Sequence, residues 1–521
     1  YTTLFRSCYA FINATIVKDA QNTQQHATMV IREGKIIAVG TSVVIPKDAV
    51  IVDCKEKCIY PSFIDIYSDY GIAASQHPST QTTSGAYGWN KAIKPEINAS
   101  QLFSVDNAKA KTLREIGFGT VLTHLKDGIA RGTGAVVTLA NQKENLVILK
   151  EKASAHYSFN KGTSPQGYPS SLMGSIALLR QTYLDAQWYK NNPTTEGLNL
   201  SLQAWNDNQS LPQIFDVMEK PNADQSTKWN VLRADRIGDE FGVQYVVKAS
   251  GYEYQRMNEM ATTKATFILP LNFPQEMDLE DPNDARFVSL SDMKHIEMAP
   301  GNAAAFEKAN IPFCLTAADL QDSKQFMTNL RKAFEYGLSE TKAMEALTKT
   351  PATLLGVYDK VGSLDVGKLA NFIITSGPVF SEKTIIYQNW VQGNKYGVKE
   401  DSWNNISGDY KLIISSAAGS TDYLLNVKNN NEATVIGKDT FTTSLNSDGH
   451  IVKLNFSLVS NKKGKSLIAA APAESNIRLS GVNNGDIWQG IGEDSIGNKF
   501  LWTATFVKAT AAKNNLAKRS E

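Results

Sequence analysis

Residues 60–69, with the sequence YPSFIDIYSD, decide the fold of this chain. Within them, Phe63–Tyr67 is a short apolar run of β-forming residues, which predicts a buried strand. Pro61 comes before the run, and the polar residues Ser68 and Asp69 follow it. When further short runs of this kind alternate with helical patterns, the order indicates a sheet of parallel strands.

Runs of the same kind recur between residues 62 and 351. The predicted strands are Phe63–Tyr67, Gly119–Thr123, Ala135–Leu139, Leu146–Leu149, Asn230–Ala234, Gln244–Ala249, Thr266–Pro270 and Pro312–Thr316. Between them apolar residues repeat at helical spacing, for example Phe326, Leu330 and Phe334, and Gly337 is placed to end that helix. The pattern predicts an α/β fold in which residues 62–351 form a (β/α)8 TIM-like barrel.

Strand patterns flank the predicted barrel on both sides. Residues 1–61 contain alternating strands and tight turns, and residues 352–400 return to the same pattern, so we expect the two segments to form one composite β-domain. Residues 405–512 are short alternating strands between Asn-, Gly- and Ser-rich turns. They predict a C-terminal antiparallel β barrel or sandwich domain, and residues 513–521 a polar tail or linker.

The composition excludes several classes of partner. The 521 residues carry a formal net charge of +1, so neither nucleic acid nor a membrane surface is expected as a partner. No apolar run approaches the roughly 20 residues of a membrane-spanning helix.

The spacing of Cys54 and Cys58 fits two positions beside a turn better than it fits a metal site. A disulfide between these two cysteines is an alternative if the compartment is oxidising.

Two segments resemble motifs of the metal-dependent amidohydrolase superfamily, in its imidazolonepropionase/dihydroorotase-like group. Residues 60–69 resemble the P-G-F-I-D-x-H-x-H of its first barrel strand, and GSLDVGKLANFII at residues 362–374 resembles the segment in which the chain leaves the barrel. The resemblance covers about residues 8–397. The chain also resembles the N-terminal half of long bacterial secreted proteins with two amidohydrolase modules in tandem, of which the first is degenerate and the second keeps its histidines.

The resemblance implies a zinc or other divalent-metal site, because active members hold the metal with histidines from strands one, five and six and an Asp from strand eight. The matching strand-one positions here are Tyr67 and Asp69. Asn230 matches on predicted strand five and Ser250 after strand six, whereas Asp319 keeps the family residue. Asp319 is therefore the one predicted catalytic position, and no metal cofactor is expected in this chain.

Further residues complete the predicted vestigial pocket. Lys248 or Arg233 is expected to pair with Asp319, which would turn the former metal pocket into a salt-bridged plug. His124 ends strand two and could face the barrel mouth, although a hydrogen-bonded strand-end histidine is the commoner case. Residues 131–134, RGTG, lack the spacing of a phosphate-binding loop and predict a turn before strand three.

Three functions stay open from the sequence. The first is a degenerate, non-catalytic module, a pseudoenzyme that serves as scaffold or partner of an active amidohydrolase module, in the same polypeptide or as a separate subunit. The second is a working hydrolase of C–N bonds in amides, cyclic amides or peptide-like substrates, with Tyr67, Asp69, Asp319 and His124. The third is a ligand-binding module with Arg233 and Lys248 in its mouth. By resemblance we also expect an oligomer and a secreted, periplasmic or outer-membrane-associated location.

Overall fold

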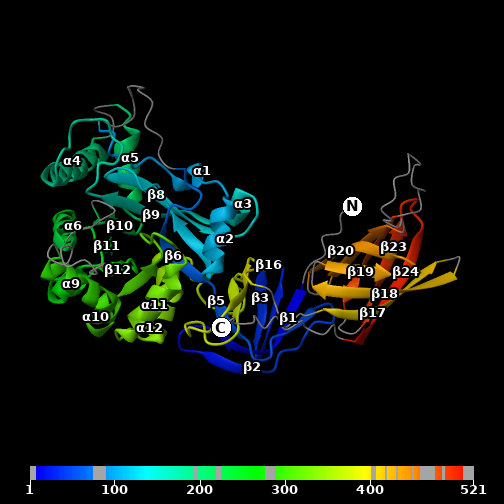
Figure 1. The fold of residues 1–521 in the computed structure, drawn as a ribbon. Coiled ribbons are helices and arrows are strands. Elements are labelled where there is room, and N and C mark those ends of the chain that lie inside the picture. Colours follow the sequence, from blue (N-terminus) through cyan, green and yellow to red (C-terminus); the bar gives the residue numbers. More distant parts are fainter. Residues whose placement is uncertain are drawn as a thin grey trace. The chain divides into compact units, whose positions relative to one another are not determined.

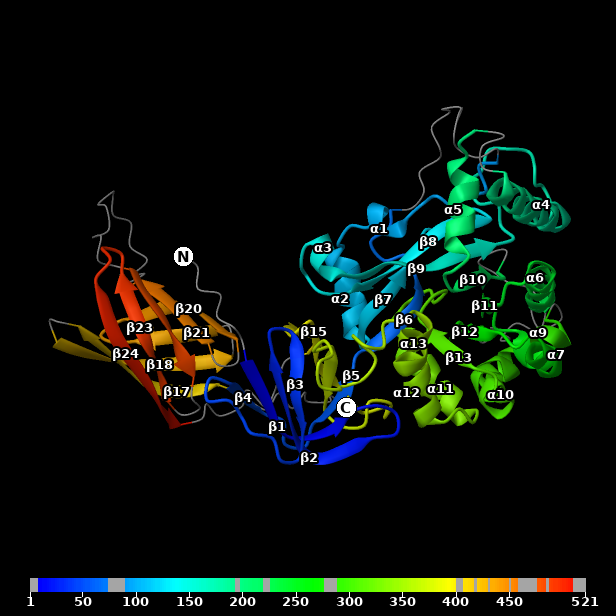
Figure 2. The same cartoon turned by 180° about the vertical axis from the view of Figure 1, so that it is seen from behind.

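The computed structural model describes residues 8–73, 90–192, 197–218, 225–275, 288–399, 406–416, 419–429, 432–448, 451–457, 476–483 and 487–508. Contacts divide the chain into two compact units, residues 1–399 and 400–521. Figures 1 and 2 show the elements of both units from opposite sides. Among the described residues, no helix combines the length and the apolar character that a membrane crossing requires.

The first unit contains a sheet built from both flanks of the barrel. Its strand order is β16-β15-β14-β5-β1-β2-β3, with β4 paired to β1. The strands are β1 (Cys8–Val17), β2 (Thr23–Arg32), β3 (Lys35–Gly40), β4 (Val50–Asp53), β5 (Cys58–Pro61), β14 (Phe372–Thr375), β15 (Ile386–Val391) and β16 (Asn394–Gly397). The late strand β14 pairs antiparallel with β5, which confirms the predicted composite β-domain. Cys54 and Cys58 beside the β4–β5 turn are free thiols, so no disulfide joins them.

A second eight-stranded sheet, in the order β6 to β13, forms the barrel. Its strands are β6 (Phe63–Ser68), β7 (Phe118–Thr123), β8 (Ala130–Thr138), β9 (Ile148–Ser158), β10 (Gln213–Asp216), β11 (Tyr245–Lys248), β12 (Thr266–Pro270) and β13 (Phe313–Thr316). The hydroxyl of Thr316 on the last strand donates to Asp65 Oδ1 on the first at 2.6 Å, so the two ends of the sheet meet. Seven strands run in the parallel sense of a TIM-like barrel, whereas β8 is antiparallel to both neighbours.

Helices surround this sheet (Figures 1 and 2). They are α1 (Ala99–Leu102), α2 (Asn107–Glu115), α3 (Glu144–Val147), α4 (Leu172–Asn191), α5 (Leu200–Asn208), α6 (Lys228–Phe241), α7 (Met257–Thr262), α9 (Leu290–Met298), α10 (Asn302–Lys308), α11 (Gln325–Glu335), α12 (Glu340–Leu347) and α13 (Lys349–Leu354), with single 3-10 turns at Gln225–Thr227, Glu253–Arg256 and Ala299–Gly301. In α11, Phe326, Leu330 and Ala333 form the buried stripe. Gly337 follows with φ of 101° and ends the helical path, as predicted.

The structure corrects the predicted elements at four places. Residues 230–234 lie inside helix α6, whose buried residues Asn230, Val231, Ala234 and Ile237 recur at helical spacing. The fifth strand is instead β10, which lies outside all of the predicted strands. Residues 146 and 147 belong to α3, and β9 begins at Ile148. Residues 131–134 are not a turn, because they lie within β8.

The second unit is a closed antiparallel barrel of β17 to β24. The strands are β17 (Gly408–Ser416), β18 (Gly419–Asn429), β19 (Glu432–Ile436), β20 (Thr440–Asp448), β21 (Ile451–Ser457), β22 (Asn476–Asn483), β23 (Ile487–Asp494) and β24 (Lys499–Lys508). β17 pairs with β24 and closes the barrel. Leu412, Trp488, Trp502 and other buried side chains fill it as a core of its own. Of the two predicted architectures, the barrel is the one observed; the predicted tail lies outside the described residues.

Candidate functional site

Strand β6 carries the residues that begin the site. Asp65 is 2% exposed and accepts hydrogen bonds from the Thr316 hydroxyl at 2.6 Å and from the Tyr67 backbone N–H at 3.1 Å. Burial raises the pKa of Asp65 to about 6, against the lowering effect of these hydrogen bonds. Asp65 therefore joins the first and last strands and fixes the backbone from which Tyr67 projects into the barrel.

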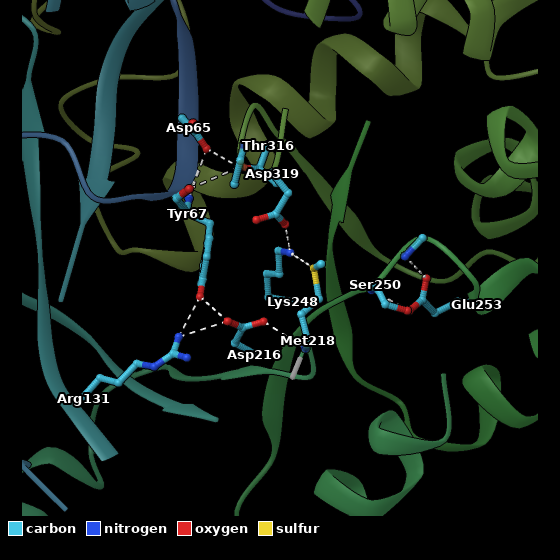
Figure 3. A network of polar contacts seen from close by, with 12 residues as sticks. Asp65, Tyr67, Arg131, Asp216, Met218, Lys248, Ser250, Glu253, Thr316 and Asp319 are labelled. Atoms are coloured by element: carbon cyan, nitrogen blue, oxygen red, sulfur yellow. Dashed lines mark hydrogen bonds and ion pairs between the residues drawn. The ribbon is translucent and has the colours of Figure 1, made fainter. Parts of the chain in front are cut away.

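The Tyr67 phenol meets an ion pair between two other strands (Figure 3). Its hydroxyl donates to Asp216 Oδ2 at 2.7 Å, and Arg131 Nη1 donates to the Tyr67 oxygen at 2.9 Å and to Asp216 Oδ2 at 3.0 Å. Arg131 comes from the antiparallel strand β8 and Asp216 from the end of β10. The side chains of Arg131 and Asp216 are only 5% and 13% exposed, so each of the two buried charges is compensated by the opposite charge of the other.

A second ion pair lies beside the first. Lys248, at the end of β11, pairs through Nζ with Asp319 Oδ2 and also lies 2.9 Å from the sulfur of Met218. Asp216 and Lys248 are register partners on neighbouring strands, and Lys248 Nζ lies 5.5 Å from the centroid of the Tyr67 ring. Figure 3 shows Lys248 between the two carboxylates. We name Tyr67, Arg131, Asp216, Lys248 and Asp319 the ion-pair cluster.

The charges of this cluster set its protonation states. Burial raises the pKa of Asp216, but the charges of Arg131 and Lys248 and the hydrogen bond from Tyr67 outweigh it and leave that pKa below its ordinary value. Burial, with the nearby charge of Asp216, holds the pKa of the Tyr67 phenol well above its ordinary value. The phenol is therefore a neutral donor at physiological pH, next to an ionised carboxylate.

Two buried histidines stack behind Tyr67. The rings of His124 and His156 have centroids 3.6 Å apart and an interplanar angle of 7°, and His124 packs against Tyr67 at 4.5 Å. Burial lowers the pKa of both imidazoles well below the ordinary value. His156 Nε2 lies 2.8 Å from the Ser154 hydroxyl, whereas the other three ring nitrogens have no hydrogen-bond partner among the described residues. The lone pairs of two stacked rings lie in parallel planes, so they do not converge on a single ion.

The predicted site residues fall into two groups. Tyr67, Lys248 and Asp319 come together, and the predicted pairing of Lys248 with Asp319 is confirmed. Asn230 and Arg233 do not join them, because both lie on helix α6, where Arg233 donates to Asn230 Oδ1 at 2.6 Å.

The remaining predicted residues lie around the cluster. Asp69 is exposed and lies just beyond the end of β6. Ser250 follows β11, and its backbone N–H and hydroxyl both donate to Glu253 Oε1 at 2.7 Å. The imidazole of His124 is buried and packs against the rings of Tyr67 and His156.

Three members of the site were missed from the sequence. Arg131 was assigned to a turn, and neither Asp216 nor His156 falls in a predicted strand, although both lie in strands of the barrel. The signal for Asp216 was the run Gln213–Asp216, in which a carboxylate follows two apolar residues just as Asp319 follows β13.

The residues present do not fit a divalent metal at this position. Asp216 and Asp319 are the two carboxylates of the cluster, and both are engaged by cationic side chains. Among the described residues there is no group of three or more His, Cys, Asp or Glu side chains placed to hold a metal ion. A metal that met Arg131 and Lys248 here would face two positive charges in a buried setting.

Comparison with known proteins gives a family match over part of the chain and a similar fold in solved structures. Residues 299–403 match the Amidohydrolase family, and no curated protein matches the chain. Among solved structures, an amidohydrolase from Thermotoga maritima MSB8 is similar, with a TM-score of 0.59 and 20% identity over 74% of this chain and 99% of that chain. A similar solved structure is that of molinate hydrolase, with a TM-score of 0.43 and 12% identity over 75% of this chain and 95% of that chain. Another is A. niger ochratoxinase, with a TM-score of 0.41 and 13% identity over 75% of this chain and 96% of that chain.

Proposed function

We propose that this chain, which has the amidohydrolase fold and matches that family over residues 299–403, is a non-catalytic module that acts as scaffold or partner of an active amidohydrolase module. The observation that carries the proposal is the ion-pair cluster at the carboxyl ends of the barrel strands. In this fold class, catalytic groups are placed at that end of the barrel. Here the same place holds two salt bridges and a protonated phenol.

The chemistry of the cluster supports this proposal. Hydrolysis of an amide requires a polarised carbonyl and an activated water, which a metal with an open coordination position supplies in active members of the family. In the cluster, Arg131 neutralises Asp216 and Lys248 neutralises Asp319. Asp216 is a weak base, because the cationic charge beside it lowers the pKa of its carboxyl rather than raising that pKa toward neutrality. The cluster therefore stabilises a fold without presenting a base or a nucleophile.

The test is metal content together with hydrolysis. The purified chain is incubated with zinc, manganese or iron, freed of loose metal, and analysed by mass spectrometry of the elements, with an active metal-loaded amidohydrolase treated in parallel. We expect substoichiometric metal and no release of amine from dipeptide and cyclic amide substrates. Stoichiometric metal, or hydrolysis that disappears in both Asp319→Asn and Asp216→Asn, would show instead a working hydrolase with an unusual site.

The partner is proposed from the resemblance to tandem-module proteins, and its test is separate. If an amidohydrolase module with intact metal ligands is encoded beside this one, the two are produced together and apart. We expect the active module to lose stability or turnover when this chain is omitted. Equal stability and equal turnover with and without it would refute the scaffold role.

One specific observation favours a second candidate, the ligand-binding module. A cavity of about 260 Å³ opens beside Asp319, and neutral carboxamides line it together with aromatic rings. The carboxamides include Asn272, Asn302 and Gln325, and the rings include Tyr252 and Phe273. Asn302 is 4% exposed, and its Oδ1 has no hydrogen-bond partner among the described residues. Carboxamides beside aromatic faces suit a neutral polyhydroxylated ligand such as a sugar.

This candidate is tested by direct binding. N-acetylglucosamine and glucose are titrated into the chain and followed by saturation-transfer NMR, with glucuronate and a neutral dipeptide as comparison ligands. We expect the neutral sugars to bind and Gln325→Ala to weaken them, whereas Gln187→Ala on the distant helix α4 leaves binding unchanged. Absence of sugar binding, or equal binding by the Gln325 variant, would eliminate the candidate.

A further inference from the structure

Helix α4 (Leu172–Asn191) has two apolar faces, and only one of them packs against the barrel. The inner face buries Leu178, Leu179, Tyr183, Ala186 and Tyr189. On the outer face, Met173, Leu184 and Trp188 are 79%, 52% and 44% exposed, and Ala177 is exposed as well. A helix that shows only a polar surface to solvent is the ordinary case, so an outer apolar stripe requires an explanation.

The outer residues form one continuous stripe. At about 100° per residue, Met173, Ala177, Leu184 and Trp188 all lie within an arc of about 60°, directly opposite the centre of the buried face. The exposed polar residues Gln181 and Gln187 flank this arc on the two sides, and Arg180 lies beside it. An apolar centre with a polar rim is the arrangement of a protein interface.

The stripe is also symmetric about its own midpoint. Ala177 and Leu184 lie equally far from the midpoint between Arg180 and Gln181, and so do Met173 and Trp188. When two copies of such a helix pack antiparallel across a two-fold axis at that midpoint, Leu184 of each copy meets the small Ala177 of the other. Trp188 of each copy then meets the flexible Met173. An isologous interface requires this self-complementarity, in which each residue and its counterpart contact each other reciprocally.

We propose that the outer stripe of α4 binds the same stripe of a second copy of this chain, so that the protein forms a two-fold dimer through antiparallel α4 helices. The charges at the rim permit this pairing, because Arg180 is already neutralised by Glu240 Oε2 at 2.7 Å on the same copy. A single helix pair lies at the small end of specific interfaces, so we expect a reversible dimer with a dissociation constant on the order of micromolar.

The oligomeric state in solution tests the proposal. Sedimentation velocity of the full chain over a range of concentrations should show a monomer–dimer equilibrium. Leu184→Glu should raise the dissociation constant at least about tenfold, because it places a charge at the centre of the stripe. Leu290→Glu is the matched control, since Leu290 on α9 is an equally apolar residue that is 67% exposed. It should leave the dimer unchanged.

Cysteine cross-linking tests the axis itself. Gln181 lies next to the proposed two-fold axis, so two Gln181→Cys chains should form a disulfide-linked dimer under mild oxidation. Lys190 is exposed on the same helix but points away from the stripe, so Lys190→Cys chains should not form this disulfide-linked dimer. The wild-type chain gives the background from its own thiols, three of which are buried.

Each contrary result counts against the proposal. A chain that stays monomeric at all concentrations, a dimer that is as strong in Leu184→Glu as in wild type, or equal cross-linking of Gln181→Cys and Lys190→Cys would overturn it. Circular dichroism of every variant confirms that the helix is folded, so that a lost dimer is attributed to the surface.

Discussion

At the scale of single residues, the buried charges of Arg131 and Asp216 depend on each other. Arg131 Nη1 lies 3.0 Å from Asp216 Oδ2, and both side chains are largely shielded from water. We predict that Arg131→Met destabilises the fold by about 3–5 kcal/mol, because it removes the cation that is hydrogen-bonded to the buried carboxylate of Asp216. The double variant Arg131→Met/Asp216→Leu should recover much of this loss, since it removes both charges. Urea unfolding of the variants measures the difference.

An exposed ion pair provides the control for this prediction. Arg180 and Glu240 lie 2.7 Å apart, but their side chains are 41% and 43% exposed. Arg180→Met should therefore change the free energy of unfolding by less than about 1 kcal/mol. Equal losses in Arg131→Met and Arg180→Met would mean that burial does not control the strength of the cluster.

The stacked histidines give the molecule a dependence on pH. Burial holds the pKa of His124 and His156 well below the ordinary value of about 6.5, and the charges of Lys126 and Arg131 lower it further. In the unfolded chain both rings bind protons below about pH 6.5, while the folded chain does not. The two rings therefore leave the free energy of unfolding unchanged above that pH. As the pH drops toward the pKa values of the folded state, the free energy of unfolding falls by up to about 1.4 kcal/mol per pH unit for each ring.

The measurement compares urea unfolding at neutral and mildly acidic pH in wild type and in His124→Leu. The variant should lose less stability on acidification, because one depressed imidazole is gone. Burial raises the pKa of Asp65 to about 6, so protonation of this carboxyl increases the free energy of unfolding as the pH falls. Asp65 is present in both proteins, so its contribution cancels when the two pH slopes are compared. An identical pH slope in the two proteins would contradict the prediction.

At the scale of elements, the antiparallel strand β8 leaves room for the histidines through a glycine. A Cβ on Gly134 would lie 2.6 Å from His156 Nε2 and 2.7 Å from the Ser154 hydroxyl. We predict that Gly134→Ala costs roughly 1–3 kcal/mol, because strand β9 and the stacked rings must shift. Gly167→Ala is the control, since nothing lies within 4 Å of its added Cβ. Thermal unfolding of both variants measures the difference in their stability. Equal losses of stability in Gly134→Ala and Gly167→Ala would refute the steric argument.

The same elements explain which parts of the fold were predictable. Strands such as β6, β11, β12 and β13 are short apolar runs between polar residues, and the sequence predicts them. Residues 230–234 were assigned to a strand as a short apolar run, although their apolar residues follow a helical period. Strand β10 directly follows Pro212 and has only two apolar residues, Ile214 and Phe215, between the polar residues Gln213 and Asp216, so its sequence gives no clear apolar run.

The site was predictable only where its residues follow predicted strands. Lys248 ends β11 and Asp319 lies three residues after β13, both of them predicted strands, so the pairing of these two residues could be predicted. Arg131 reaches the cluster because β8 runs against its neighbours, and nothing in the local sequence signals that reversal. Contacts between Arg131, Asp216 and Tyr67 join residues far apart in sequence, which local patterns do not specify.

At the scale of the whole molecule, the chain contains two units with separate hydrophobic cores. The core of the first unit surrounds the barrel strands and includes Leu269, which is 1% exposed. The core of the second unit fills the closed β-barrel and includes Leu412, which is 0% exposed. Since the two cores share no residues, each unit has its own source of hydrophobic stabilisation.

We therefore predict two transitions in calorimetry of the full chain, one for each unit. Leu412→Ala removes a fully buried side chain from the C-terminal barrel and should destabilise only that unit, by about 2–5 kcal/mol. Leu269→Ala is the matched variant in the first unit and should lower only the other transition. If either variant shifted both transitions equally, or if a single transition described the whole chain, the units would be folding as one cooperative body despite their separate cores.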